Sequence, residues 1–314
     1  MRSSGPHAKV RARRREAPVS DDELRWVEAE GGYALALEGD TLVCRNKTGK
    51  RLASVPSKVK KGEVGRQLSE LRAWLSEHRQ RCAGQVERWM LRSLPVPRGA
   101  LEATWRDPAW RAALENAVVT PARADGSLDL DAGGFFKGAD PAKGVGVVTL
   151  DGETEWLDTA EVVVPHPILL EELEDYRELA AELSFEQGVS QLFRETFSPP
   201  EDLEPDARQD RRFAGGEFDE LRFVVGRSRS RGFRVSGGYA LCPVWEQGRL
   251  FEGRYWIGMG EGWESTWTGE LLWVDQDDRA QKVSEVGPVA YSEGVRMASL
   301  IYAGRKTEDA KEEE

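Results

Sequence analysis

Residues 68–90 are the stretch that decides the fold, and they read LSELRAWLSEHRQRCAGQVERWM. Side chains that suit a protein core recur there every three or four residues, at Leu68, Leu71, Leu75, His78, Cys82, Val86 and Met90. This spacing places them on one face of an α-helix, because 3.6 residues complete each helical turn. The stretch therefore predicts a long amphipathic helix, which Pro95 and Pro97 prevent from continuing.

Strand-like segments stand on both sides of this helix. They are short, they alternate apolar with polar or small side chains, and turn residues separate many of them. Before the helix they lie at 24–29, 33–37, 41–45 and 51–55, which predicts a four-stranded meander. After it they lie at 145–150, 155–157 and 161–164, and then at 221–225, 233–241, 254–259, 266–274 and 286–290.

Shorter helices are predicted between these strands. Asp107 before Pro108 is typical of a helix N-cap followed by proline at the first helical position. Two further apolar stripes at helical spacing predict an amphipathic helix pair in the middle of the chain. The expected helices cover 109–118, 169–183, 185–197 and 295–301.

Together these elements predict an α+β fold, with antiparallel β segments, a long amphipathic helix and a central helix pair, followed by a β-rich C-terminal half. Residues 198–210 are rich in Pro, Asp and Glu, which is typical of a domain boundary. The expected organisation is a disordered basic arm over 1–20, an α+β domain over 21–200, a β-rich region packed on it over 201–304, and an acidic tail over 305–314.

The composition is that of a chain with a real core. Hydrophobic residues make up 39% of the 314 residues, which is too much for intrinsic disorder. No apolar run reaches the ~18 residues of a membrane span, and no apolar stretch follows the basic N-terminus, so neither a membrane partner nor a secretory signal is expected. The isolated cysteines favour the cytosol, and the net charge of −11 disfavours a nucleic-acid surface over the whole molecule.

The common catalytic motifs are absent in usable form. A Ser-x-x-Lys at 57–60 and a Lys-Thr-Gly at 47–49 occur in the reverse of the order that serine acyl-enzymes use, and no Ser-Asp-Asn accompanies them. The three histidines are not at ligand spacing, and no glycine-rich phosphate loop occurs. The sequence therefore predicts no metal and no cofactor.

Aromatic side chains are dense between Trp245 and Trp273, and Arg227, Arg229 and Arg231 come shortly before them. A platform on which bases or sugars stack is one interpretation. Packing of the aromatic side chains in a β-sheet core is the favoured one.

Four polar residues are candidates for a functional site. His166 lies between two prolines where a strand is expected to end and a helix to begin, and Gln191, Arg194 and Glu195 lie on the second helix of the predicted pair, on one face. His166, Arg194 and Glu195 could act as proton acceptor, cationic clamp and second carboxylate of an active site. A buried network that joins the helix to the sheet is the favoured interpretation.

The same residues carry a resemblance to a known family. The runs VVVPHP at 162–167 and FEQGVSQLFRE at 185–195 are similar to the central signature of MolR-like (molybdate-metabolism-regulator-like) bacterial proteins, which often carry a WGR domain. Arg231-Gly232-Phe233 and the run VAYSEGVR at 289–296 fit the same family. The residues that this resemblance marks as a binding or structural motif are Gln191, Arg231, Ser292, Glu293 and Arg296.

The sequence departs from that family at two places. Gly188-Val189 stands where the family has Pro-Phe, and Met297 follows Arg296 where the family has Asp. No Trp-Gly-Arg triplet occurs, so the resemblance implies no WGR-type DNA binding. It implies no established reaction either.

We expect a non-catalytic intracellular binding or regulatory module with a protein partner, as one component of a bacterial multi-protein system. One alternative is a hydrolase or nucleotide-processing enzyme that uses His166, Arg194 and Glu195. The other is a nucleic-acid accessory protein that uses the basic arm and residues 227–231.

Overall fold

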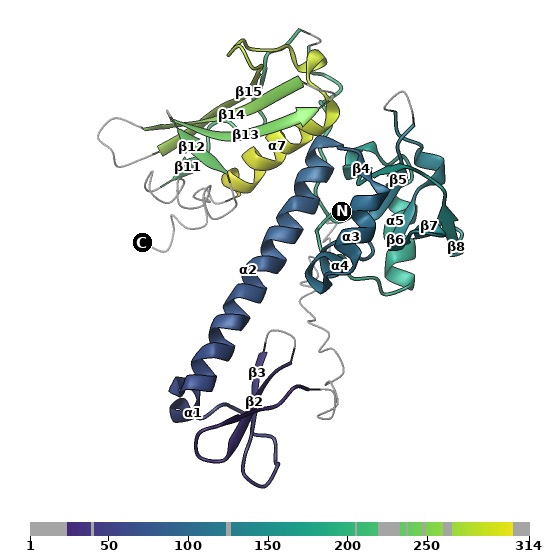
Figure 1. Ribbon diagram of the computed structural model, residues 1–314. Coiled ribbons are helices and arrows are strands. Elements are labelled where there is room, and N and C mark those ends of the chain that lie inside the picture. The colour runs from purple at the N-terminus through teal and green to yellow at the C-terminus, as the bar shows by residue number, and fades with distance from the viewer. Residues whose placement is uncertain are drawn as a thin grey trace, which may run out of the picture. The chain divides into compact units, whose positions relative to one another are not determined.

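The computed structural model describes residues 24–38, 41–123, 127–204, 206–218, 233–236, 238–246, 249–259 and 266–303. The chain divides into two compact units, Met1–Gln80 and Arg81–Glu314 (Figure 1). The expected basic arm at 1–20, the strand at 221–225, Arg231 and the acidic tail at 305–314 lie outside the described residues.

The described part of the first unit contains a three-stranded antiparallel sheet with β2 in the centre. Its strands are β1 (Val27–Ala29), β2 (Tyr33–Glu38) and β3 (Thr41–Arg45). The fourth predicted strand at 51–55 is wrong, because only Arg51 pairs with the sheet, through an isolated bridge to Arg45. Pro56 cannot donate a ladder hydrogen bond, and helix α1 (Ser57–Lys61) begins directly after it.

The core of the first unit lies between this sheet and the helices. Leu35, Cys44 and Val59 are buried in it. Apolar side chains of the loop after Arg51 also pack there, which explains why that loop looks strand-like in sequence. Helix α2 (Glu63–Arg92) begins in this unit and ends in the second, and the prediction of one long helix is confirmed.

The described residues of the second unit form two six-stranded antiparallel sheets. The first sheet has the order β4-β9-β5-β6-β7-β8, and the second has the order β10-β15-β14-β13-β12 with β11 paired to β15. The strands of the first sheet are β4 (Val96–Pro97), β5 (Val118–Pro121), β6 (Gly134–Asp140), β7 (Gly144–Val148), β8 (Thr154–Leu157) and β9 (Glu161–Val163). Those of the second are β10 (Gln209–Asp210), β11 (Glu217–Phe218), β12 (Arg234–Ser236), β13 (Tyr239–Glu246), β14 (Arg249–Met259) and β15 (Thr266–Val274).

Short helices accompany the first sheet. They are α3 (Arg98–Trp105), α4 (Pro108–Leu114), the 3₁₀ turns η1 (Leu130–Ala132) and η2 (Pro167–Leu169), and α5 (Leu173–Glu182). The predicted N-cap of α4 is confirmed, since the Asp107 carboxylate accepts a hydrogen bond of 2.8 Å from the Ala109 N–H. The helix ends at Leu114, earlier than predicted, because Asn116 adopts a positive φ of 60° and β5 begins at Val118.

The prediction of a second helix in the central pair, over 185–197, is wrong. Helix α5 ends at Glu182, Ser184 has a positive φ of 52°, and no residue from 185 to 197 is helical. A Cβ at Gly188 would lie 1.8 Å from the Ala112 carbonyl oxygen, so the backbone passes very close to α4 there. Phe193, expected in the apolar stripe of this helix, is 63% exposed.

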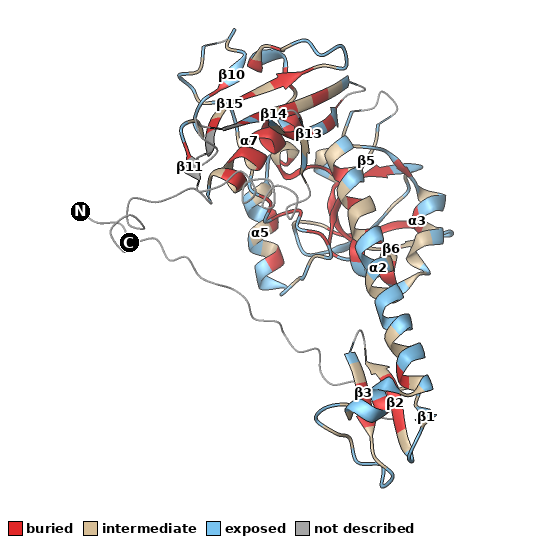
Figure 2. Ribbon diagram, turned by 90° about the vertical axis from the view of Figure 1, so that its left-hand side faces the viewer, coloured by how far each residue is buried: buried red, intermediate tan, exposed pale blue. Residues whose placement is uncertain are grey.

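Helix α7 (Pro288–Tyr302) lies across β13, β14 and β15, and its residues are largely buried (Figure 2). The predicted strand at 286–290 is wrong, since that stretch turns into the first residues of this helix. Two hydrogen bonds to the Glu246 carboxylate hold its start, from the Val289 N–H at 3.2 Å and the Ala290 N–H at 2.9 Å. Glu246 ends β13, so a strand residue caps the helix.

The aromatic side chains of the second sheet divide between core and surface. Phe251, Tyr255 and Trp273 are buried beneath α7, which agrees with the favoured interpretation. Trp245 and Trp256 are more than a third exposed.

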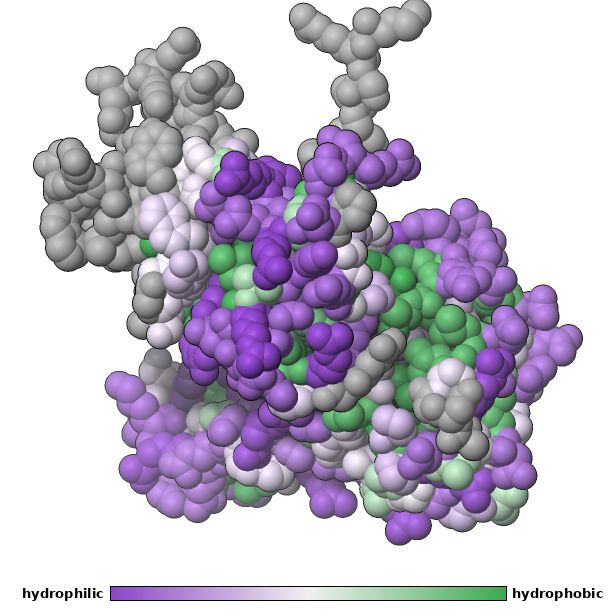
Figure 3. Space-filling model, turned by 90° about the horizontal axis from the view of Figure 1, so that it is seen from above, coloured by the Kyte–Doolittle hydropathy of each residue, from purple (hydrophilic) through white to green (hydrophobic). Residues whose placement is uncertain are grey.

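The surface carries some apolar side chains. Figure 3 shows a face on which an apolar area is bordered by hydrophilic side chains. Leu71, Trp74 and Trp156 are among the exposed large hydrophobic residues. Within the described ranges, no helix has the length and apolarity needed to cross a lipid bilayer.

A buried ionic cluster as candidate functional site

His166 is placed by the end of β9 and the start of η2. The prolines on either side fix the backbone there, because each locks its own φ angle. The imidazole Nδ1 accepts a hydrogen bond of 3.2 Å from the Ile168 N–H and so caps η2. The side chain is completely buried.

The contacts of His166 define its protonation. Because Nδ1 accepts from Ile168, the proton of the neutral ring is on Nε2, which donates to Glu293 Oε1 at 3.2 Å. Burial lowers the pKa of His166, although the hydrogen bond and the charge of Glu293 act in the opposite direction. His166 is therefore a neutral donor in the folded protein.

Glu293, on α7, is the acceptor at the centre of the cluster. Arg194 binds it with two parallel hydrogen bonds, from Nε to Oε1 at 2.6 Å and from Nη2 to Oε2 at 2.5 Å. Burial alone would raise the pKa of Glu293, but the hydrogen bonds from Arg194 and His166 outweigh it and lower the pKa to about 2. The carboxylate therefore stays ionised.

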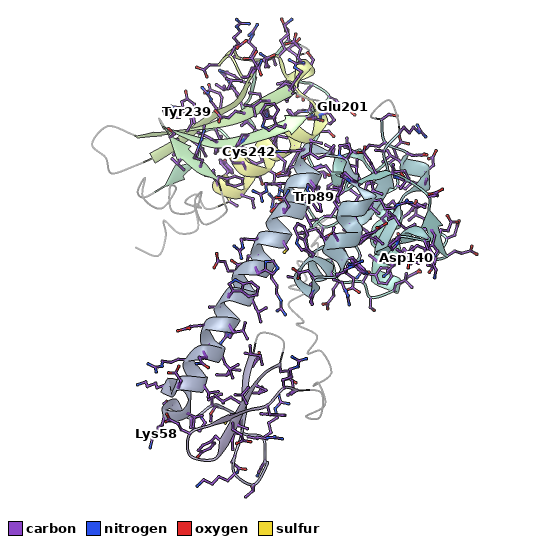
Figure 4. All side chains as sticks on the ribbon, in the orientation of Figure 1. Lys58, Trp89, Asp140, Glu201, Tyr239 and Cys242 are labelled. Atoms are coloured by element: carbon purple, nitrogen blue, oxygen red, sulfur yellow. The ribbon has the colours of Figure 1, made fainter. Side chains whose placement is uncertain are left out.

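Arg194 has a second partner. Its Nη1 donates to Glu87 Oε1 at 2.7 Å. Glu87 lies on the part of α2 that belongs to the second unit, two residues before Trp89, which Figure 4 labels. Burial would lower the pKa of Arg194, but Glu293 and Glu87 together raise it. A planar guanidinium suits this position, because its fork can serve two carboxylates at once.

The edge of the cluster is more open than its centre. Glu87 is 44% exposed, whereas Arg194 and Glu293 are 6% and 2% exposed. Arg296, one turn after Glu293, lies 3.7 Å from Glu293 Oε2 and is partly exposed. Two carboxylates and two guanidinium groups therefore balance, with His166 neutral.

Gln191 holds a second, uncharged network. Its Oε1 accepts from the Val118 N–H at 2.7 Å, and its Nε2 donates to the carbonyls of Val118 at 3.1 Å and Pro165 at 2.7 Å. The Gln191 amide thus forms the hydrogen bonds with β5 that a neighbouring strand would form. It also connects β5 to Pro165, the residue before His166. Ser292 acts similarly on α7, where its Oγ accepts from the Phe197 N–H at 3.1 Å.

The predicted site residues are only partly brought together. His166, Arg194 and Glu293 converge, and Gln191 and Ser292 hold the adjoining backbone. Glu195 is exposed, and no hydrogen bond or ion pair among the described residues joins it to His166, Arg194 or Glu293, although its charge acts on Arg296. The prediction that Gln191, Arg194 and Glu195 share a helix face is wrong. The reason is that residues 185–197 form an irregular segment, in which three-residue spacing does not define a face.

The contacts of Glu87 and Glu293 with the other members of the cluster could not be predicted from the sequence. Glu87 belongs to the charged side of an amphipathic helix, and nothing in the sequence distinguishes it from the other charged residues there. Glu293 was marked only by the run at 289–296. Its contact with His166 joins residues 127 positions apart.

The arrangement has the properties of a structural network. His166, Arg194 and Glu293 find partners in one another, and none of them lines the pockets at Tyr176, at Trp256 or at Thr41. The described part of the chain also has no group of three or more His, Cys, Asp or Glu side chains that could hold a metal ion. A proton acceptor needs access to its substrate, which this burial denies.

The cysteines offer no alternative nucleophile in this conformation. Cys44, Cys82 and Cys242 are buried free thiols. Burial raises the pKa of each thiol, so the reactive thiolate is disfavoured. Cys242 lies on β13 beneath α7 (Figure 4), and the charge of Glu293 raises the pKa of its thiol further.

Comparison with known proteins identifies one family. A family profile matches residues 49–233, and its description reads "Domain of unknown function (DUF4132)". The matched range contains His166, Gln191 and Arg194, whereas Glu293 lies beyond it. No curated protein matches the chain, and no solved structure matches it.

Proposed function

The chain belongs to the DUF4132 family, and from that premise we propose that it is a non-catalytic binding or regulatory module inside the cell. The observation that carries the proposal is the complete burial and mutual pairing of His166 with Glu293. The residues best suited to catalysis are used to hold α7 against the rest of the unit.

The surface supports a binding role. Apolar side chains form an area bordered by hydrophilic ones on the face in Figure 3, and such areas mark interaction sites on many proteins. We further propose a protein partner, a place in a bacterial multi-protein system, and a relation to the MolR-like proteins, on the basis of the runs at 162–167, 185–195 and 289–296.

The enzyme alternative predicts turnover. The full chain would be assayed against p-nitrophenyl esters, p-nitrophenyl phosphate and nucleoside triphosphates, beside the variants His166→Gln and Glu195→Gln. We expect no turnover above the buffer rate for any of the three proteins. Turnover that is lost in His166→Gln, while its circular dichroism spectrum is retained, would show an enzyme and overturn the proposal.

The molar mass of the native species tests whether the chain has a protein partner. The full chain, recovered from its own cells without denaturation, would be passed over a sizing column with light-scattering detection. We expect a species heavier than the 35.1 kDa chain that contains a second polypeptide at fixed stoichiometry. Recovery of this chain alone, as a monomer or homo-oligomer, would count against a protein partner.

A further inference from the structure

A pocket separate from the ionic cluster opens beside the first residues of α5. Its volume is about 210 Å³, enough for a side chain of the size of lysine. The walls come from the end of β5, from η1 and from the turn before α5. The residues that define its chemistry are Arg123, Leu130, Asp131, Leu170, Glu172 and Tyr176.

Tyr176 is the most informative of these residues. It is 3% exposed, and its ring packs edge-on against Phe135 with 5.6 Å between ring centroids. Among the described residues none forms a hydrogen bond with its hydroxyl, although buried hydroxyls usually have a partner. An unpaired buried hydroxyl destabilises a protein, and one beside a pocket is available to form a hydrogen bond with a ligand there.

The hydroxyl lies at the pocket wall. A Cβ placed on Gly133, just after η1, would be 3.1 Å from the Tyr176 oxygen, which locates that oxygen beside the Leu130–Asp131 wall. The pKa of Tyr176 is raised to about 12, mainly by burial and further by the charge of Glu172. Glu172, Asp131 and the hydroxyl are therefore neighbours around one space.

The charge of the pocket is negative. Asp131, Glu171 and Glu172 line it, while the one arginine, Arg123, is held by Asp129 at 2.8 Å. The N-terminus of α5 adds only a partial positive charge. A cation is therefore favoured over an anion, and the leucines of the wall suit an apolar stem.

We propose that this pocket binds an organic cation, an ammonium or guanidinium group on an aliphatic stem, with Tyr176 as hydrogen-bond acceptor and Glu172 as counter-charge. The inference rests on the proposed binding function and names its ligand chemistry. The cation can belong to a free diamine or to a lysine or arginine side chain of a peptide, and both present the same group.

The test is calorimetric titration of the full chain with three probes. They are 1,5-diaminopentane, N-acetyl-lysine methylamide, and glutarate, which has the same carbon chain but carries two carboxylates. We expect one or both cations to bind and glutarate not to bind. Tighter binding of the lysine derivative assigns the site to a peptide, and tighter binding of the diamine assigns it to a free amine.

Variants locate the binding. Tyr176→Phe and Glu172→Gln are each expected to weaken cation binding by roughly tenfold, the effect of losing a hydrogen bond to a charged group. Glu178→Gln, on the exposed side of the same helix and outside the pocket, removes the same charge and should change the dissociation constant less than twofold. Tyr176→Phe should not lower the unfolding midpoint, because the hydroxyl it removes has no partner.

Three results would overturn the inference. They are binding of glutarate in place of the cations, equal cation binding by the wild type and Tyr176→Phe, and absence of cation binding at 10 mM probe. None of them bears on the turnover assay, so failure of the pocket and failure of the proposed function are distinguishable.

Discussion

The two hydrogen bonds of His166 explain its structural role. Nδ1 caps η2 and Nε2 donates to Glu293, so both nitrogens are occupied when the ring is neutral. A second proton on Nδ1 would face the Ile168 N–H. The fold therefore accommodates the imidazole only as the neutral tautomer, and protonation of His166 should destabilise the folded protein.

The stability of the protein should fall in acid in two stages. The folded pKa of His166 lies below its ordinary value of 6.5, so its contribution is complete above pH 6.5 and is lost as the pH falls below it. The folded pKa of Glu293 is about 2 against an ordinary 4.5, so its contribution is present above pH 4.5 and is lost between pH 4.5 and 2. Urea unfolding at a series of pH values measures both stages.

Two variants test whether His166 is responsible for the loss of stability that begins near pH 6.5. His166→Gln should remove the decline that begins near pH 6.5, because the group to which that decline is assigned is gone. His78→Gln, a partly exposed histidine on α2, should leave that decline unchanged. A decline that survives in His166→Gln would contradict the assignment.

At the scale of elements, side chains from distant strands and loops decide where helices begin and which segments stay irregular. Glu246 at the end of β13 receives the first N–H groups of α7. Gln191 pairs with the backbone of β5 and takes the place of a ladder partner. These contacts satisfy backbone groups that a helix start and a sheet would otherwise leave unpaired.

Removing the cap of α7 should destabilise the second unit. Glu246→Ala leaves the N–H groups of Val289 and Ala290 without an acceptor and removes a negative charge from a helix N-terminus. We expect the free energy of unfolding to fall by about 1–3 kcal/mol, measured by urea denaturation.

Glu285→Ala is the matched control, since it removes an exposed carboxylate just before the same helix. Its effect should stay within about 0.5 kcal/mol. Equal losses in the two variants would show that general charge near α7, and not the cap, is responsible.

On the scale of the whole molecule, the ionic cluster joins parts of the second unit that are far apart in the chain. Glu87, His166, Arg194 and Glu293 come from α2, the β9–η2 junction, the 185–197 segment and α7. Burial of charges costs free energy, so such a cluster is maintained only when every member is paired.

A double-mutant cycle on Arg194 and Glu293 tests this dependence. Arg194→Met and Glu293→Met should each lower the free energy of unfolding by roughly 3–5 kcal/mol, because each leaves a buried partner uncompensated. The double variant should cost less than the sum of the two by about 1–3 kcal/mol.

The exposed pair of Arg211 and Glu270, 3.1 Å apart, provides the comparison. Arg211→Met should cost no more than about 1 kcal/mol, since solvent screens this pair. Additive losses at Arg194 and Glu293 would refute the coupling.

The sequence by itself determined the elements with strong local periodicity. Local residue spacing is enough to predict helix α2, the cap at Asp107, the strands β2 and β3, and the α+β class. Only the tertiary structure decided that residues 185–197 stay irregular and that 286–290 begins a helix. Both outcomes depend on acceptors or neighbours that other segments supply, such as Glu246 for α7 and Ala112 for Gly188.

The candidate site divides in the same way. His166, Gln191, Arg194 and Glu293 could be singled out from sequence, but their pairing could not, nor could the exclusion of Glu195. Spacing along the chain specifies which side chains share a face of one element. An ion pair between residues 99 positions apart, or a hydrogen bond between residues 127 positions apart, depends on how separate elements pack, and that information exists only in the folded molecule.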